Sequence, residues 1–156
     1  MASAMGFFSK FRASASPEKR AIDELADLAG RKEALIARLG RHATRCAYPA
    51  MAAELNALAE KEAAHFKILR AILSDRQTWP RPPENQPREG ASNWERLGGD
   101  LAILVAIAAG LRLSAMHWEA VDQKIGDTLD TMATEDVDYE SDLRKLALKC
   151  DPQAFD

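Results

Sequence analysis

The sequence predicts an all-α protein: a four-helix bundle with a long connection between the second and third helices. Apolar residues recur at helical spacing in four segments, and prolines or capping residues mark where these segments begin. One proline-rich stretch separates the second segment from the third. The 156 residues are enough for a single domain with a sizeable core. The bundle is therefore expected to occupy residues 16–149.

The first helix is predicted over residues 17–40. Ser16 supplies an N-cap and Pro17 suits the first helical position. Apolar residues then follow at helical spacing, and the ladder Ile22, Ala26, Ala29, Glu33, Ile36 places a carboxylate among apolar neighbours. Residues 1–15 are expected to form a flexible tail, whose phenylalanines either pack against the bundle or make a weak surface or partner contact.

The second helix is predicted over residues 49–73 and carries two ionisable residues on its apolar stripe. The stripe consists of Met51, Leu55, Leu58, Glu62, His65, Leu69 and Ile72. A buried carboxylate and imidazole need partners, which are either a metal ion or each other and neighbouring side chains. Counted from a turn at Cys46, Glu33 and Glu62 differ in axial level by about 4.5 Å, so these two carboxylates are expected to meet.

The connection is predicted over residues 74–93, with Pro80, Pro82, Pro83 and Pro87. Its length allows the chain to return along the whole bundle, so that the third helix runs parallel to the second. The third and fourth helices are predicted over residues 94–120 and 123–149, followed by a short tail over 150–156.

An internal repeat places the start of the fourth helix at Asp122. A shift of 74 residues carries the stripe of the second helix onto Ile125, Leu129, Met132, Asp136, Tyr139, Leu143 and Leu146. Gly126 then lies inside the helix. If the helix broke at Gly126 instead, His117 and Glu119 would come level with Asp136 and could supply ligands there.

The segment LAEKEAAH, Leu58 to His65, resembles the second-helix signature of the rubrerythrin branch of the ferritin-like superfamily. The resemblance implies a ferritin-like bundle, in which a single long crossover joins helices 2 and 3. It also implies two helix pairs that each supply a carboxylate and a Glu-x-x-His to two iron ions. A homodimer is expected on the same resemblance.

The resemblance assigns Glu33, Glu62 and His65 to one half of such a site. The other half departs from the family pattern, because Asp136 and Tyr139 stand at the Glu and His positions and Ile107 at the position matching Glu33. These oxygen donors with one imidazole suit one iron or manganese ion, or an incomplete di-iron pair completed by water.

Composition excludes several other classes. A net charge of −3 lacks the basic excess that favours nucleic acid, and the most apolar run, residues 101–111, is short for a membrane span and is expected to be a buried helix. Two cysteines, Cys46 and Cys150, are too few for a disulfide framework, so a cytoplasmic location is expected.

Two functional hypotheses follow. The first is a ferritin-like metalloprotein with a non-haem iron or manganese site, active in oxidant or iron handling such as peroxide reduction or iron oxidation. The second is a non-catalytic helical bundle that has lost the di-iron centre and serves as an assembly or interaction module.

Overall fold

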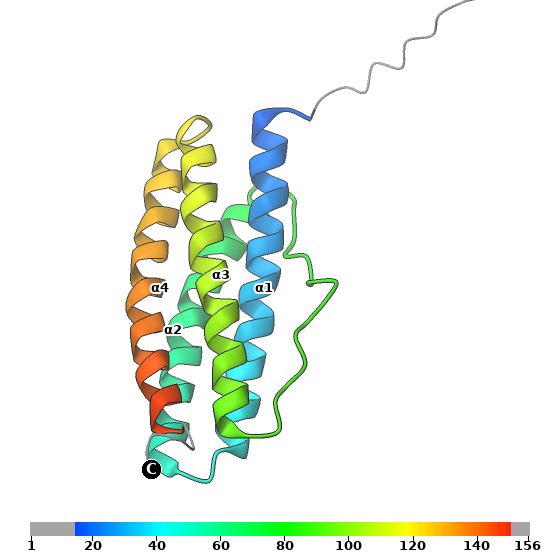
Figure 1. Cartoon of the computed structure of the whole chain (residues 1–156). Coiled ribbons are helices and arrows are strands. Elements are labelled where there is room, and N and C mark those ends of the chain that lie inside the picture. The colour runs from blue at the N-terminus through cyan, green and yellow to red at the C-terminus, as the bar shows by residue number, and fades with distance from the viewer. Residues whose placement is uncertain (1–14, 151–156) are drawn as a thin grey trace, which may run out of the picture.

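The structure, a computed structural model, describes residues 15–150, which form four α-helices and no strand (Figure 1). The helices are α1 (Pro17–Arg45), α2 (Pro49–Ser74), α3 (Asn93–Glu119) and α4 (Gln123–Lys149). The prediction of an all-α four-helix bundle is confirmed. The expectations for the two chain ends concern residues 1–14 and 151–156, which lie outside the described residues.

Three of the helices begin at side chains that satisfy free backbone N–H groups. The Ser16 hydroxyl accepts a hydrogen bond from the first turn of α1. Ser92 and Glu95 cap α3 reciprocally, and the carboxylate of Asp122 accepts from two N–H groups of α4. Such caps stabilise a helix end by about 1 kcal/mol each, so local sequence fixes these starting points.

The first helix extends beyond its predicted end at residue 40. It continues through Gly40 to Arg45, and the added turn buries His42 and Ala43. A glycine inside a helix costs about 1 kcal/mol relative to alanine. Burial of the following turn against the bundle outweighs that cost.

The four helices surround one apolar core. α1 packs against α2 and α3, and α4 packs against α3 and α2. Leucine dominates the interior, and the fully buried apolar side chains include Leu25, Leu35, Leu39, Leu55, Leu69, Leu73, Leu104, Ile107, Leu111, Trp118, Leu129 and Leu143. The candidate site lies within this core.

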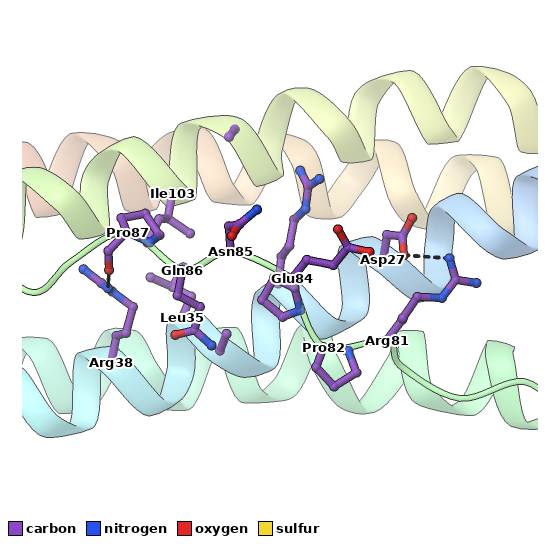
Figure 2. Close-up of a pocket in the computed structure, with 14 residues that line it drawn as sticks. Asp27, Leu35, Arg38, Arg81, Pro82, Glu84, Asn85, Gln86, Pro87 and Ile103 are labelled. Carbon is purple, nitrogen blue, oxygen red and sulfur yellow. Dashed lines mark hydrogen bonds and ion pairs between the residues drawn. The ribbon is translucent and has the colours of Figure 1, made fainter.

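The connection between α2 and α3 lies along α1 (Figures 1 and 2). The Arg81 N–H donates to the carbonyl of Ala26 at 2.9 Å, and further along the helix Arg38 Nη1 donates to the carbonyl of Pro87 at 2.8 Å. Glu89 then pairs with two arginines near the end of α1. These contacts hold the connection against α1 over several turns.

A pocket of about 480 Å³ lies beneath this connection (Figure 2). Leu35 of α1 and Ile103 of α3 line it on one side, and residues 81–87 line it on the other. Its lining contains neither Glu62, His65 nor Asp136. The pocket and the candidate site are therefore separate features.

The third helix is buried on one side only. Ile107 and Leu111 are fully buried, whereas Val105, Leu113 and Met116 are 40%, 55% and 64% exposed. Among the described helices, α3 alone is long and apolar enough to cross a membrane by length and composition, a test that core helices of soluble proteins also pass. The expectation of a buried helix thus describes only one face of α3.

Candidate metal centre

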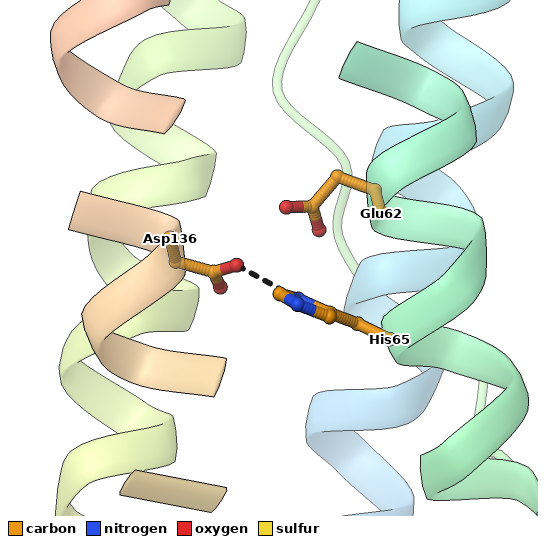
Figure 3. A group of neighbouring side chains, drawn as sticks. All are labelled: Glu62, His65 and Asp136. Carbon is orange, nitrogen blue, oxygen red and sulfur yellow. Dashed lines mark hydrogen bonds and ion pairs between the residues drawn. The ribbon is translucent and has the colours of Figure 1, made fainter. Parts of the chain in front are cut away.

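Three predicted site residues converge in the middle of the bundle. Glu62 and His65 lie one turn apart on α2, and Asp136 faces them from α4 (Figure 3). One ligand atom from each residue lies within 4.8 Å of the others, and all three residues are buried. This group could hold a metal ion.

A cation of the protein itself already lies between these carboxylates. Lys32 Nζ is 2.5 Å from Glu62 Oε2, and 2.8 Å and 3.1 Å from the two carboxylate oxygens of Asp136. The side chains of Lys32, Glu62 and Asp136 are 0% exposed. The ammonium therefore makes the contacts with Glu62 and Asp136 that a metal ion would otherwise make.

His65 is held by two carboxylates. Its Nδ1 lies 3.1 Å from Asp136 Oδ1, and its Nε2 lies 2.5 Å from Glu135 Oε2. An imidazole that donates from both nitrogens is protonated and has no lone pair for a metal. The ring of Tyr139 stacks on that of His65, with 5.6 Å between ring centroids. The Lys61 ammonium lies over the Tyr139 ring, 5.0 Å from its centroid.

The burial of these groups changes their protonation. Burial raises the pKa of Glu62 to about 7, against the opposing charge of Lys32. Burial lowers the pKa of His65, but hydrogen bonds to Asp136 and Glu135 outweigh it, so the pKa is raised overall. For Asp136, burial raises the pKa, yet the hydrogen bond from His65 and the charge of Lys32 leave it lowered.

These shifts give the cluster a balanced charge. Below pH about 7 a protonated Glu62 is neutral. The positive charges of Lys32 and His65 are then matched by the negative charges of Asp136 and Glu135. A buried group of charges needs this kind of pairing, since an unpaired charge in the core is strongly unfavourable.

The structure does not bring Glu33 to this cluster. Glu33 is exposed, and the neighbouring Lys32 faces the interior instead. The expectation that Glu33 shares the buried face with Glu62 is wrong, because α1 is rotated so that its inward ladder passes through Leu28, Lys32 and Leu35. A glutamate one position along a helix points about 100° away.

The remaining predicted positions lie at the edge of the cluster or away from it. Tyr139 is half-buried beside His65, and burial raises the pKa of its hydroxyl. Ile107 is fully buried and offers no donor atom. His117 pairs with Glu24 at 2.7 Å on the surface, and α4 continues through Gly126, so the alternative route to the site through His117 does not occur.

A second buried ionic cluster lies near the C-terminal end of α1. Asp100 of α3 accepts a hydrogen bond from Arg38 Nε at 3.0 Å and contacts Nδ1 of His42. Sequence reasoning missed this group and Lys32, although both follow a detectable signal. Lys32 fills the gap in the stripe between Leu28 and Leu35, and Asp100 interrupts a similar stripe in α3.

The donor set does not fit a two-ion centre. It offers Glu62, His65 and Asp136 from two helices, whereas α1 supplies a cation and α3 supplies Ile107. A single ion fits only if the Lys32 ammonium moves away from the carboxylates and His65 gives up the proton on one of its ring nitrogens. Comparison of the chain with protein-family models and with curated protein sequences finds no match.

Proposed function

We propose that the chain is a ferritin-like bundle that works without a metal ion and serves as a non-catalytic assembly module. Its layout supports the relationship to ferritin-like bundles, because the connection between α2 and α3 follows α1 from Ala26 to Arg38. α3 then starts where α2 starts, and the two run in the same direction. A single long crossover of this kind is also found in ferritin-like bundles, which supports the proposed relationship.

The contacts of Lys32 carry the proposal. A buried ammonium bound to both carboxylates supplies the positive charge that a metal would supply. His65 is hydrogen-bonded to Glu135 and Asp136 through its two ring nitrogens, so the carboxylates of the cluster need no further cation. A buried ionic group whose charges are matched by the protein's own side chains fits the proposed structural role.

The outer face of α3 supplies the surface for assembly, and its occupant is a second copy of this chain. Between residues 98 and 120 its exposed side is mostly apolar, and Arg112 is one of the few charges there. The face is also self-complementary. In an antiparallel pair centred on Ala109, Met116 of one copy meets Ala102 of the other, and Leu113 meets Val105, so large side chains meet smaller ones.

Light scattering on the purified protein tests the assembly. The wild type is expected to be a dimer, and Leu113→Glu is expected to be a monomer because it places a charge in the apolar interface. Val137→Glu is a matched control, since Val137 is 44% exposed on α4 and lies outside the proposed face. A monomeric wild type, or equal dissociation by both substitutions, would rule out dimerisation through α3.

Metal analysis tests the state of the centre. Protein purified from cells supplied with iron and manganese is expected to carry no more of either metal than His65→Ala. His65 is a buried candidate ligand on α2 and is not part of the exposed face of α3. Its substitution therefore removes a ligand without changing the proposed dimer surface. The oligomer and the metal content are therefore read independently.

A second candidate function is binding of one iron or manganese ion, with activity in oxidant or iron handling. The observation that favours it is the convergence of three buried ligand atoms within 4.8 Å. In this case Glu62, His65 and Asp136 would hold the ion, and Lys32 would give up its place to it. An ion present in wild type at one per chain and lost in His65→Ala would establish this function in place of the metal-free centre.

A further inference from the structure

Three sulfur atoms gather where α1 and α4 end and α2 begins. Cys46 ends α1, Cys150 ends α4, and Met51 lies in the first turn of α2. Both cysteines are free and half-buried against the core. Figure 1 shows the end of α4 beside the start of α2, at the opposite end of the bundle from the α3–α4 turn.

The distances suit two ligands of one ion. Cys150 Sγ lies 3.9 Å from Met51 Sδ. Two sulfurs bound to one metal with bonds of about 2.3 Å and an angle near 120° would lie about 4 Å apart. Cys46 and Met51 both line a small cavity that has no room for a water molecule. Burial raises the pKa of the Cys150 thiol, and the nearby Cys46 adds a smaller effect in the same direction.

A buried nitrogen donor lies beside the same cavity. His42 is one helical turn before Cys46, is 2% exposed and also lines this cavity. Its Nδ1 contacts Asp100, while its Nε2 has no hydrogen-bond partner among the described residues and lies 3.8 Å from the nearest carboxylate oxygen of Glu89. His42 therefore borders the three sulfur atoms but is not one of the proposed ligands, because its Nδ1 contacts Asp100 and the nearest acidic group to its Nε2 is Glu89.

We propose that Cys46, Met51 and Cys150 form a binding site for a single Cu(I) ion, separate from the Glu62 cluster. Thiolate and thioether donors select soft ions such as Cu(I), and a thioether is not among the usual ligands of Zn²⁺. Each coordinating cysteine releases its thiol proton to solvent, and the oxidation state of copper does not change. The half-buried thiols let the ion reach the site from solution.

Anaerobic titration of the reduced full chain with Cu(I), in competition with the chelator bicinchoninate, tests the site. One Cu(I) per chain is expected, and Cys46→Ser and Cys150→Ser are each expected to weaken binding at least about 10-fold. Met51→Leu preserves the packing volume and is expected to weaken binding by about the same factor. Sulfur-only coordination is expected in the X-ray absorption spectrum of the wild-type complex.

Controls separate this site from other thiol chemistry. His65→Asn is expected to bind Cu(I) as tightly as wild type, because His65 lies in the central cluster. Unchanged affinity in Met51→Leu would overturn the proposal, since it would mean that the two half-buried thiols capture the ion without the thioether. Equal loss in His65→Asn would overturn it too. Circular dichroism of each variant confirms that the helices are retained.

Discussion

Lys32 of α1 and Glu62 of α2 form an ion pair of 2.5 Å in the interior of the bundle, with both side chains 0% exposed. The ammonium is shared with Asp136 of α4 at 2.8 Å, so three helices contribute to one ionic cluster. A buried pair of this kind contributes less to net stability than its short distance suggests, because both charges had to leave water. Removing one member, however, leaves the others uncompensated.

The first prediction concerns Lys32 itself. Lys32→Met is expected to lower the free energy of unfolding by about 3–5 kcal/mol, because the Asp136 carboxylate, and Glu62 where it is ionised, lose their shared buried cation. Chemical denaturation measures the change. Lys67→Met, an exposed lysine of α2, is expected to change stability by no more than about 0.5 kcal/mol. Equal stability of the two variants would contradict a charged Lys32 in the core.

The second prediction is a loss of stability as pH rises. The pKa of Glu62 is raised from 4.5 to about 7 in the folded protein, so the folded state binds more protons than the unfolded state between these values. That contribution is complete below pH about 4.5 and is lost as pH rises through about 7, on the order of 3 kcal/mol. The raised pKa of His65 acts in the same direction, with its contribution complete below pH 6.5.

Unfolding curves between about pH 5 and about pH 8 measure this slope. Glu62→Gln is expected to flatten it, whereas Glu60→Gln, an exposed neighbour on α2, leaves it unchanged. The lowered pKa of Asp136 has the opposite sign and removes stability only as pH falls below 3.8. Rising stability across the neutral range in wild type would contradict the raised pKa of Glu62.

The third prediction uses two glycines of α1. A Cβ at Gly30 would lie 1.7 Å from the carbonyl oxygen of Arg81, so Gly30→Ala must displace the connection. A loss of about 1–3 kcal/mol is expected, together with faster hydrogen exchange at the Arg81 amide. Gly40 has no atom within 4 Å of such a Cβ, so Gly40→Ala is expected to gain about 1 kcal/mol from helix propensity. Destabilisation of similar size at both positions would show that the connection does not lie against Gly30.

The fourth prediction concerns the second buried cluster. Asp100→Ala leaves Arg38 and His42 without their shared carboxylate and is expected to cost about 3–5 kcal/mol. Asp142 pairs with Lys145 at 3.7 Å on the surface, so Asp142→Ala is expected to cost no more than about 1 kcal/mol. Thermal unfolding of the two variants compares them directly. A neutral effect at Asp100 would mean that Arg38 and His42 find other partners.

Much of the site was predictable because helical spacing is a local property. Glu62 and His65 share the apolar stripe of α2, and the repeat shifted by 74 residues identifies Asp136 as the corresponding residue of α4. The structure buries all three together. Periodicity within one helix and similarity between two helices were sufficient for this prediction, since neither depends on how the helices are rotated against each other.

The choice between Lys32 and Glu33 was not predictable in the same way. α1 carries two overlapping apolar ladders, one through Ala29 and Glu33 and the other through Leu28 and Lys32. From the sequence of α1 alone, either ladder could be the one that faces the core. In the structure Leu28 and Ala29 are both buried, whereas one turn later packing against α2 and α3 buries Lys32 and leaves Glu33 exposed.

The sequence by itself determined the four helices, the capping residues Ser16 and Asp122 that start two of them, and the three ionisable residues that face the interior from α2 and α4. Only the tertiary structure decided that a lysine lies between the two carboxylates, and that Asp100 joins Arg38 and His42. The physical reason is that helix formation depends on residues a few positions apart. The rotation of one helix against its neighbours is instead set by side-chain packing between segments distant in the chain.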